Sequence, residues 1–274
     1  MKSLNIIGCG RVGKTLARLW HDQGRYRIQD VLTRSESSAL EAIAFIGSGR
    51  AVRQCSEMRS AEVWMLAVPD RQSAKAAADL ALFQNAQSEP PGIAFHCSGA
   101  LASTELLALQ KSGWPVASAH CLLSFAKPDS ALQQFAGTPC ALEGDPAALS
   151  ELEQSFTQIG ARCFALAPEN KLLYHAGAVF ATNFLPVLQS VANQLWATSG
   201  VPADVARHLN ASLLKNAVDN LLALGPAGAL TGPAARGDVA LVQRQGDAVA
   251  EWDATAGEAY RALSQLAAKL ANPS

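Results

Sequence analysis

The chain has 274 residues, of which 49% are hydrophobic and only 16% are charged. This composition predicts a folded protein with a sizeable core and argues against an intrinsically disordered chain. The 22 Lys and Arg residues nearly balance the 23 Asp and Glu residues, and no run of basic residues occurs. The sequence therefore lacks the positive charge that attracts nucleic acids or anionic membranes, and we expect neither as a partner.

The six cysteines occur singly, and no two of them form a C-x-x-C pair. This spacing fits neither a zinc site nor a disulfide scaffold, so we expect free thiols, no metal and a reducing, cytoplasmic location. Residues 172–188 are largely apolar, but His175, Thr182, Asn183 and Pro186 interrupt them. A membrane-spanning helix needs ~18–20 clean apolar residues, so this stretch is interpreted as a buried helix.

Short runs of strand-forming residues alternate with helical patterns in the first part of the chain. The expected strands cover residues 4–7, 28–33, 63–68, 93–97, 116–120, 140–143 and 162–166. Helical patterns cover residues 12–23, 72–83, 104–111 and 147–159. Strands that alternate with helices of ~10–15 residues predict an α/β fold with a doubly wound, mostly parallel sheet that is covered on both faces.

The pattern changes after Leu166, where strand-forming runs disappear and Ala and Leu dominate. Helical periodicity covers residues 171–196, 202–224, 239–256 and 257–270, and the last two segments fit either two helices or one broken helix. We therefore predict an α/β dinucleotide-binding domain at residues 1–166 and an all-α domain at residues 167–274.

A G-x-G-x-x-G motif follows the first predicted strand and leads into a helix. It consists of Gly8, Cys9, Gly10, Arg11, Val12 and Gly13. In this context the first glycine permits a tight turn, the second lets the backbone approach a pyrophosphate, and the third lets helix and strand pack closely. The helix N-terminus then offers N–H groups and partial positive charge to the phosphates. The motif predicts a dinucleotide site, and a glycine turn without a ligand is the alternative.

The end of the second predicted strand indicates which dinucleotide binds. An acidic residue there would favour NAD, but Asp30 lies too early in the strand for that role. Thr33, Arg34 and Ser35 follow the strand instead, and a guanidinium between two hydroxyl groups suits a 2′-phosphate. We predict NADP as the cofactor, with a solvated loop arginine as the alternative.

Two later strand ends are expected to contribute to the same site, because ligands of such sheets lie beyond the carboxyl ends of the strands. Val68, Pro69 and Asp70 end one strand and would border the ribose and nicotinamide, although Asp70 fits a helix N-cap equally well. Ser98 and Gly99 end the next strand and would approach the nicotinamide or the substrate. His96, near the end of the same strand, is interpreted as a packed or hydrogen-bonded residue rather than a catalyst.

Candidate catalytic residues recur along one helix. Lys171, His175, Val179 and Asn183 recur in steps of four, so they are expected to lie along one face of a helix. Hydride transfer to a carbonyl or imine needs a proton donor and a group that orients the substrate. Lys171 or His175 would donate the proton, while Asn183, Ser98 and His120 would position the substrate. His120 is also a candidate acid or base, with a core histidine as the alternative. The alternative is a solvated Lys171, with His175 and Asn183 satisfying each other.

Together these motifs resemble the Rossmann-like proteins that carry a C-terminal helical domain of unknown function, number 2520. Those proteins are relatives of the ketopantoate reductase, β-hydroxyacid dehydrogenase, pyrroline-carboxylate reductase and prephenate dehydrogenase group. The resemblance covers essentially the whole chain. Besides the motifs above, it rests on His96 to Ala100, Ser118 to Leu122, and the loop that runs from Leu230 through Arg236 to Asp238.

The resemblance implies an NADP-linked oxidoreductase that dimerises through its helical domain, with Lys171 and Asn183 as counterparts of the relatives' catalytic pair. The expected function is reduction of a small 2-oxo or imino acid, with ketopantoate as the first candidate. A non-catalytic NADP-binding sensor or interaction module is the alternative, and a purely structural dimer is a third.

Overall fold

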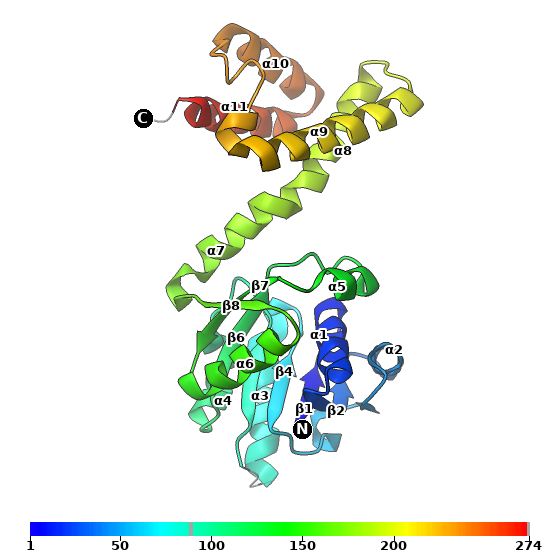
Figure 1. Ribbon diagram of the computed structural model, residues 1–274, viewed down its shortest axis with the longest axis vertical. Helices are drawn as coiled ribbons and strands as arrows, with labels where there is room; N and C mark the ends of the chain where they lie inside the picture. The colour runs from blue at the N-terminus through cyan, green and yellow to red at the C-terminus, as the bar shows by residue number, and fades with distance from the viewer. Residues whose placement is uncertain (88–89, 273–274) are drawn as a thin grey trace. The chain divides into compact units, whose positions relative to one another are not determined.

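The computed structural model describes residues 1–87 and 90–272, which fall into two compact units, Met1–Thr182 and Asn183–Ser274 (Figure 1). The first unit is α/β and the second is entirely helical, as the sequence predicts. The predicted domain boundary, after residue 166, coincides with the end of the last strand. That residues 1–166 and 167–274 form separate domains remains a prediction.

The α/β unit contains one eight-stranded sheet in the order β3-β2-β1-β4-β5-β6-β7-β8. Its strands are β1 (Lys2–Ile7), β2 (Tyr26–Leu32), β3 (Arg50–Val52), β4 (Val63–Leu66), β5 (Ile93–His96), β6 (Val116–Cys121), β7 (Pro139–Gly144) and β8 (Arg162–Ala165). Only β6 and β7 pair in antiparallel fashion; the other neighbours are parallel. The predicted doubly wound, mostly parallel sheet is confirmed.

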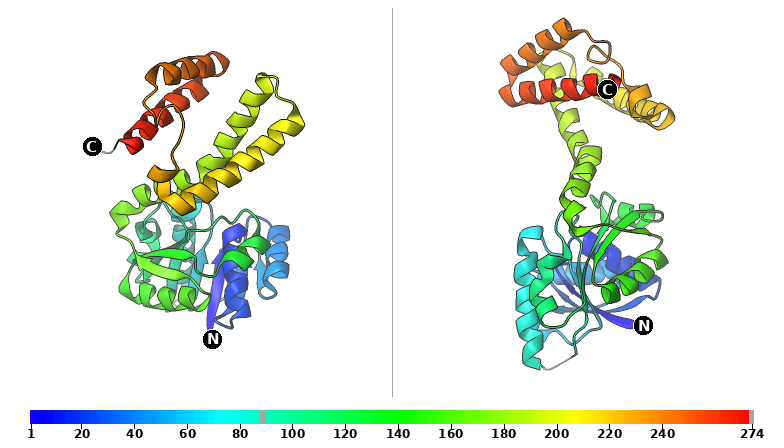
Figure 2. Two further views of the ribbon diagram at one scale, coloured as in Figure 1. Left: turned by 45° about the horizontal axis from the view of Figure 1, so that its top comes forward. Right: turned by 90° about the vertical axis from the view of Figure 1, so that its left-hand side faces the viewer.

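Two buried clusters cover the two faces of this sheet. Residues on β1 illustrate the alternation: Leu4 and Ile6 belong to one cluster, while Ile7 belongs to the other. The first cluster is covered by α1 (Arg11–Asp22), α2 (Glu36–Ile46), α5 (Pro128–Gln134) and α6 (Pro146–Gln158). The second is covered by α3 (Asp70–Gln87) and α4 (Leu107–Lys111), which lie on the opposite side of the sheet (Figure 2).

Among the strands and α-helices, three were not expected from the sequence. Strand β3 has only three residues and lies at the sheet edge, so it carries no apolar run. Helix α2 begins at an N-cap, Ser35, and ends at Gly47, whose φ of 86° is the left-handed conformation of a C-terminal glycine. These two capping residues are the sequence signals that would have revealed α2. Helix α5 is the third element.

The long apolar segment after residue 170 is not one regular α-helix. Helix α7 (Lys171–Ala178) is followed by a π-helical turn, Val179–Asn183, and then by α8 (Phe184–Thr198). The division between the two units falls inside the π turn. A π turn contains more residues per turn than an α-helix, so the rotation per residue changes between α7 and α8.

The helical unit continues with α9 (Ala203–Ala229), α10 (Val239–Trp252) and α11 (Ala254–Ala271). Helix α9 is kinked where Gly225 has φ 71° and Pro226 follows. Helices α10 and α11 are separate, because Asp253 between them has extended backbone and its carboxylate accepts a hydrogen bond from the N–H of Ala256. Within the described residues, no helix is long and apolar enough to cross a membrane.

Candidate functional site

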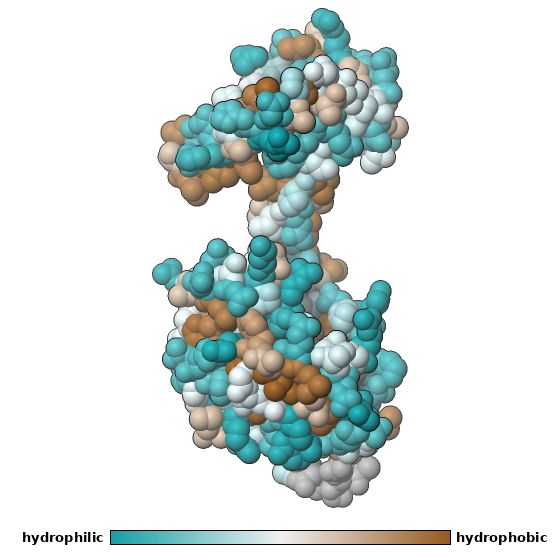
Figure 3. Space-filling model, turned by 90° about the vertical axis from the view of Figure 1, so that its right-hand side faces the viewer, coloured by the Kyte–Doolittle hydropathy of each residue, from teal (hydrophilic) through white to brown (hydrophobic). Residues whose placement is uncertain are grey.

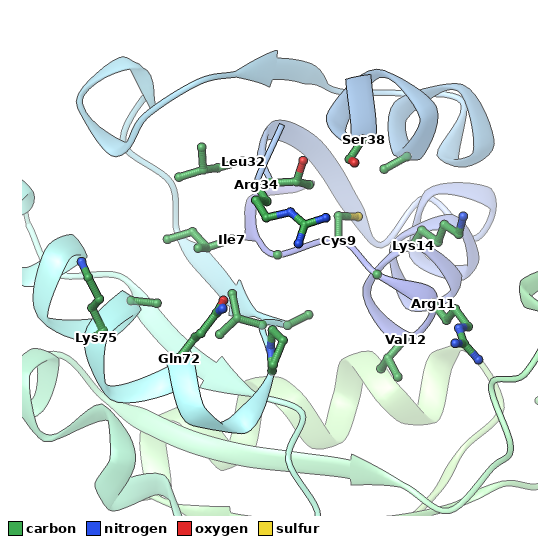
Figure 4. A pocket seen from close by; sticks show the side chains of 18 of the residues that line it. Ile7, Cys9, Arg11, Val12, Lys14, Leu32, Arg34, Ser38, Gln72 and Lys75 are labelled. Carbon is green, nitrogen blue, oxygen red and sulfur yellow. The ribbon is translucent and has the colours of Figure 1, made fainter. Parts of the chain in front are cut away.

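A cleft of about 960 Å³ lies at the carboxyl ends of β1, β2 and β4. The strand order reverses between β1 and β4, which is where sheets of this topology bind ligands. The walls come from the glycine motif, the end of β2, the turn after β4 and one face of α3 (Figure 4). Of the predicted cofactor residues, the lining includes Gly8, Cys9, Gly10, Arg11, Val12, Thr33, Arg34, Val68 and Pro69.

The three motif glycines stand in different environments. Gly8 has φ 79°, and a Cβ added to it would lie 2.6 Å from Val68 Cγ1 and 2.7 Å from Val68 N, so the turn and the contact with the β4 end both require glycine. A Cβ on Gly13, which lies behind the cleft, would approach Ala67 at 3.1 Å, so α1 packs closely on the sheet there. Gly10 differs, because nothing lies within 4 Å of an added Cβ. The open space of the cleft thus begins at Gly10, the N-cap residue of α1.

Basic side chains line the cleft from both sides. Figure 4 shows Arg34 on the side of Ser38 and Cys9, with Lys75 on α3 opposite. Lys75 forms an ion pair with Asp79 at 2.6 Å. Arg34, by contrast, has no carboxylate within ion-pair distance among the described residues, so its charge is available to an anion in the cleft.

Two predicted cofactor residues next to the cleft have other positions. The Ser35 hydroxyl caps α2 by accepting a hydrogen bond from the N–H of Ser38 at 3.3 Å, and Ser38 rather than Ser35 lines the cleft. Sequence inspection missed Ser38, although it lies one turn into the helix that Ser35 begins. Asp70 is the first residue of α3 and does not line the cleft.

The acidic residue of β2, Asp30, forms ion pairs with two arginines. Asp30 is fully buried, and its carboxylate accepts hydrogen bonds from Arg50 Nε at 2.8 Å and Arg59 Nη2 at 2.7 Å. Burial by itself would raise the pKa of Asp30, but the hydrogen bonds from Arg59 and Arg50 outweigh it and lower the pKa. Asp30 therefore stays ionised, fixes β3 and the following turn, and does not line the cleft.

A second group of polar side chains gathers at the ends of β5 and β6. Lys171 at the start of α7 is only 1% exposed, and its Nζ donates to Ser118 Oγ at 2.7 Å and to the Ser98 carbonyl oxygen at 3.1 Å. Burial lowers the pKa of Lys171, and the negative charges of Glu143 and Asp70 partly oppose that shift. The alternative of a solvated Lys171 is wrong: this side chain ties the two strand ends together.

Two histidines lie beside this lysine. The ring centroids of His120 on β6 and His175 on α7 are 5.7 Å apart, and both rings approach Gly99 so closely that a methyl group there would collide with them. The Nδ1 atom of His120 is 2.9 Å from the Tyr174 hydroxyl. Burial lowers the pKa of His120 to about 4, and the nearby His175 and Lys171 contribute in the same direction. His120 is therefore neutral at neutral pH.

His96 has a structural environment. Its Nδ1 accepts a hydrogen bond from the N–H of Ser98 at 3.1 Å, so its Nε2 carries the proton and donates to the Ala102 carbonyl oxygen at 3.0 Å. Burial lowers the pKa of His96 to about 4. The side chain thus stabilises the turn after β5. This agrees with the prediction that His96 is a packed residue.

The π turn interrupts the regular α-helix between His175 and Asn183, so a face shared by Asn183 with Lys171 and His175 remains a prediction. Asn183 is exposed and begins the helical unit. The structure brings together Lys171, His175, His120, Ser98 and Gly99 of the predicted site residues.

Sequence inspection missed two members of this group, Tyr174 and Ser118. Tyr174 lies three residues after Lys171, within one helical turn, and Ser118 lies two residues before His120, on the same face of β6. Both spacings were available as signals. In the described part of the chain, no three His, Cys, Asp or Glu side chains are grouped so as to hold a metal ion.

Solved structures with the same fold cover nearly the whole chain. TM1727 from Thermotoga maritima is 26% identical, with a TM-score of 0.74 and 98% of each chain covered. BF3122 from Bacteroides fragilis, which carries the provisional name of an NADP oxidoreductase, is 20% identical, with a TM-score of 0.77 and the same coverage. Pyrroline carboxylate reductase from Plasmodium falciparum, solved with NADP bound, is 10% identical, with a TM-score of 0.59 and coverage of 99% of this chain and 98% of that one.

None of the curated proteins matches the sequence. Residues 138–267, from the start of β7 into α11, match the family model described as a domain of unknown function, DUF2520. The resemblance inferred from the sequence motifs is thereby confirmed: residues 138–267 match the DUF2520 model, and the whole chain shares its fold with TM1727 from Thermotoga maritima.

Proposed function

We propose that this protein is an NADP-dependent oxidoreductase that reduces a small 2-oxo or imino acid, with ketopantoate as the first candidate. The observation that carries the proposal is the cleft at the strand-order reversal, which combines an open glycine loop with the unpaired guanidinium of Arg34. The fold it shares with an NADP-bound pyrroline carboxylate reductase supports the same cofactor.

The residues present fit this cofactor. The open space at Gly10, together with the N–H groups at the start of α1, would receive the pyrophosphate. Arg34 and the hydroxyls of Thr33 and Ser38 would bind the 2′-phosphate, and Val68 with Pro69 would border the nicotinamide half. Bound NADPH would supply the hydride.

The group at the ends of β5 and β6 would act on the substrate. Of the proton-donor candidates Lys171, His175 and His120 we favour the two histidines, because Lys171 already donates two of its three protons to Ser98 and Ser118. Both rings lie directly against Gly99, where any added side chain would collide with them, so this position requires glycine. We assign Asn183 only the role of a candidate substrate ligand.

We further propose a cytoplasmic homodimer joined through the helical unit. All six cysteines are free, which agrees with a reducing compartment. Of the described residues 183–272, only Ala206, Gly246 and Gly257 are buried, so this unit does not build a core of its own. A second copy of the same unit would cover the apolar side chains that remain.

Parallel titrations with NADPH and NADH, followed by tryptophan fluorescence, test the cofactor assignment. We expect tighter binding of NADPH and a loss of that preference, by about 10-fold or more, in Arg34→Ala, because one charge-assisted contact with the phosphate is removed. Lys75→Ala is the matched control, since its charge is already paired with Asp79. Equal binding of both dinucleotides by the wild type would contradict the NADP assignment.

NADPH consumption with a panel of 2-oxo and imino acids, ketopantoate included, tests the reaction. Turnover of at least one member supports the reductase. Binding of NADPH without turnover of any member would favour the non-catalytic sensor instead, and binding of neither dinucleotide would leave a structural scaffold.

A further inference from the structure

Tyr174 contacts the candidate proton donor His120 through its hydroxyl group. The Tyr174 Oη atom lies 2.9 Å from His120 Nδ1, and this is the only hydrogen bond of the Tyr174 hydroxyl among the described residues. The tyrosine ring packs edge-on against the rings of His120 and Phe164, with centroid distances of 5.6 and 6.2 Å. Strand β8 on one side and β6 on the other thus hold the hydroxyl in place.

The opposite edge of the His120 ring faces Gly99. A Cβ on Gly99 would lie 2.7 Å from both Cε1 and Nε2 of His120. Since Nδ1 is occupied by Tyr174, Nε2 is the ring nitrogen on the Gly99 side of the ring. A proton on Nε2 therefore lies on that side, beyond the end of β5.

The surroundings of His120 keep its ring neutral. The groups that face it are Lys171, Tyr174 and His175 on α7 and, more remotely, Asp70 on α3. A neutral imidazole carries one proton, and the hydrogen bond at the other nitrogen decides where that proton resides. Burial raises the pKa of Tyr174, so its hydroxyl keeps its proton and can donate it to Nδ1.

We propose that Tyr174 is the positioning residue that holds His120 in the neutral tautomer protonated at Nε2, and that Tyr174 passes its proton to His120 when His120 protonates the substrate. The inference rests on the proposed reductase function and extends it by naming the proton path. Lys171 has a structural role in this arrangement. Its ammonium group binds Ser98 after β5 and Ser118 on β6, and these bonds hold together the segments that carry Gly99 and His120.

The proton transfers balance as follows. The substrate oxygen, or the imine nitrogen, receives the electron pair of its double bond as the dihydronicotinamide hydride reaches carbon. His120 gives its Nε2 proton to that atom while its Nδ1 accepts the hydroxyl proton of Tyr174. Nε2 then takes a proton from solvent and Nδ1 returns its proton to Tyr174, which restores the starting tautomer. Each turnover thus consumes one hydride and one solvent proton, and His120 ends neutral. His120 is half-buried, so water can reach it.

Nitrogen-15 NMR of the five histidines measures the tautomer without any substrate. The His120 signals are assigned by their loss in His120→Asn. In the wild type we expect a protonated Nε2 and an accepting Nδ1, and in Tyr174→Phe a rise of several-fold in the population protonated at Nδ1. Tyr260→Phe, which removes a tyrosine hydroxyl bonded to Gln245 in the helical unit, should leave the tautomer unchanged. A proton on Nδ1 in the wild type, or the same tautomer in Tyr174→Phe, would overturn the proposal.

Kinetics on a substrate identified by NADPH consumption provide the second readout. Tyr174→Phe should lower kcat about 10- to 100-fold, with KM and the Kd for NADPH changed less than 2-fold, because only the proton path is affected. His120→Asn should cost at least as much, and the double variant no more than His120→Asn alone. Losses that multiply in the double variant would overturn the relay. If no substrate is turned over, the reductase proposal fails while the NMR measurement still decides the role of Tyr174.

Discussion

At the scale of single residues, the site depends on which buried polar groups already have partners. Lys171 has its hydrogen bonds satisfied within the fold, whereas Arg34 in the cleft has no carboxylate beside it among the described residues. The difference separates a lysine that supports the strand ends from an arginine that is free to bind an anion. Charge alone does not distinguish the two, since both are basic residues next to strand ends.

His96 leads to a prediction on the pH dependence of stability. Its pKa in the folded protein is about 4, below the unfolded value of about 6.5, so the unfolded chain binds a proton that the folded chain does not between these values. The free energy of unfolding should therefore fall as the pH drops from about 6.5 to about 4, by roughly 3 kcal/mol for this residue. Urea unfolding at pH 7 and pH 4 measures the change.

The variant His96→Gln is the control, because its amide can still donate to the Ala102 carbonyl but does not titrate. We expect a flatter pH dependence in this variant. An equal loss of stability in wild type and variant would show that other groups cause the acid sensitivity.

At the scale of elements, the turn from β1 into α1 has glycines at positions 8 and 10 for two different reasons, one of folding and one of binding. We predict that Gly8→Ala lowers Tm by several degrees, because the new Cβ would collide with Val68 and the residue would be strained at φ 79°. Gly10→Ala should leave Tm nearly unchanged, since its Cβ enters open space, yet weaken NADPH binding 10-fold or more by occupying the path of the pyrophosphate. Thermal unfolding together with NADPH titration of both variants tests this difference. Normal NADPH affinity in Gly10→Ala would contradict the proposed cofactor position.

The helical segment after residue 170 shows how one irregular turn alters an interpretation. A spacing of four residues places His175 one turn beyond Lys171 within α7, and there the prediction of a shared face is sound. The π turn Val179–Asn183 then changes the rotation per residue, so the face shared with Asn183 stays a prediction. Spacing along a helix is reliable only as far as the helix stays regular.

At the scale of the whole molecule, the helical unit leaves much apolar surface uncovered. Brown, apolar residues are visible on its surface in Figure 3, and Leu222 on α9 is 81% exposed. A folded unit rarely exposes so many large apolar side chains unless a partner covers them. This surface is the physical reason for the proposed dimer.

Light scattering after gel filtration tests the dimer directly. We expect the mass of two chains for the wild type and a shift toward one chain in Leu222→Asp, because a carboxylate would be buried without a partner at the interface. Leu82→Asp is the matched control: Leu82 is 73% exposed as well, but it lies on α3 of the α/β unit, so the dimer should persist. A single-chain mass for the wild type would contradict the proposal.

The sequence by itself determined the α/β fold, the order of most strands and helices, and the position of the glycine motif. It could do so because these features depend on local periodicity and on the special backbone conformations of glycine. Strand β3 escaped prediction because three residues at a sheet edge carry too little apolar pattern.

Only the tertiary structure decided the partners of the polar side chains. Lys171 meets the Ser98 carbonyl across 73 residues of sequence, and Tyr174 meets His120 across 54. Such pairs depend on which strands become neighbours and on where α7 lies against their ends, and no local pattern encodes that. The sequence therefore identified His120 and Lys171 as candidates. The packing of α7 on β5 and β6 places the Tyr174 hydroxyl beside His120 and buries Lys171 in hydrogen bonds to Ser98 and Ser118.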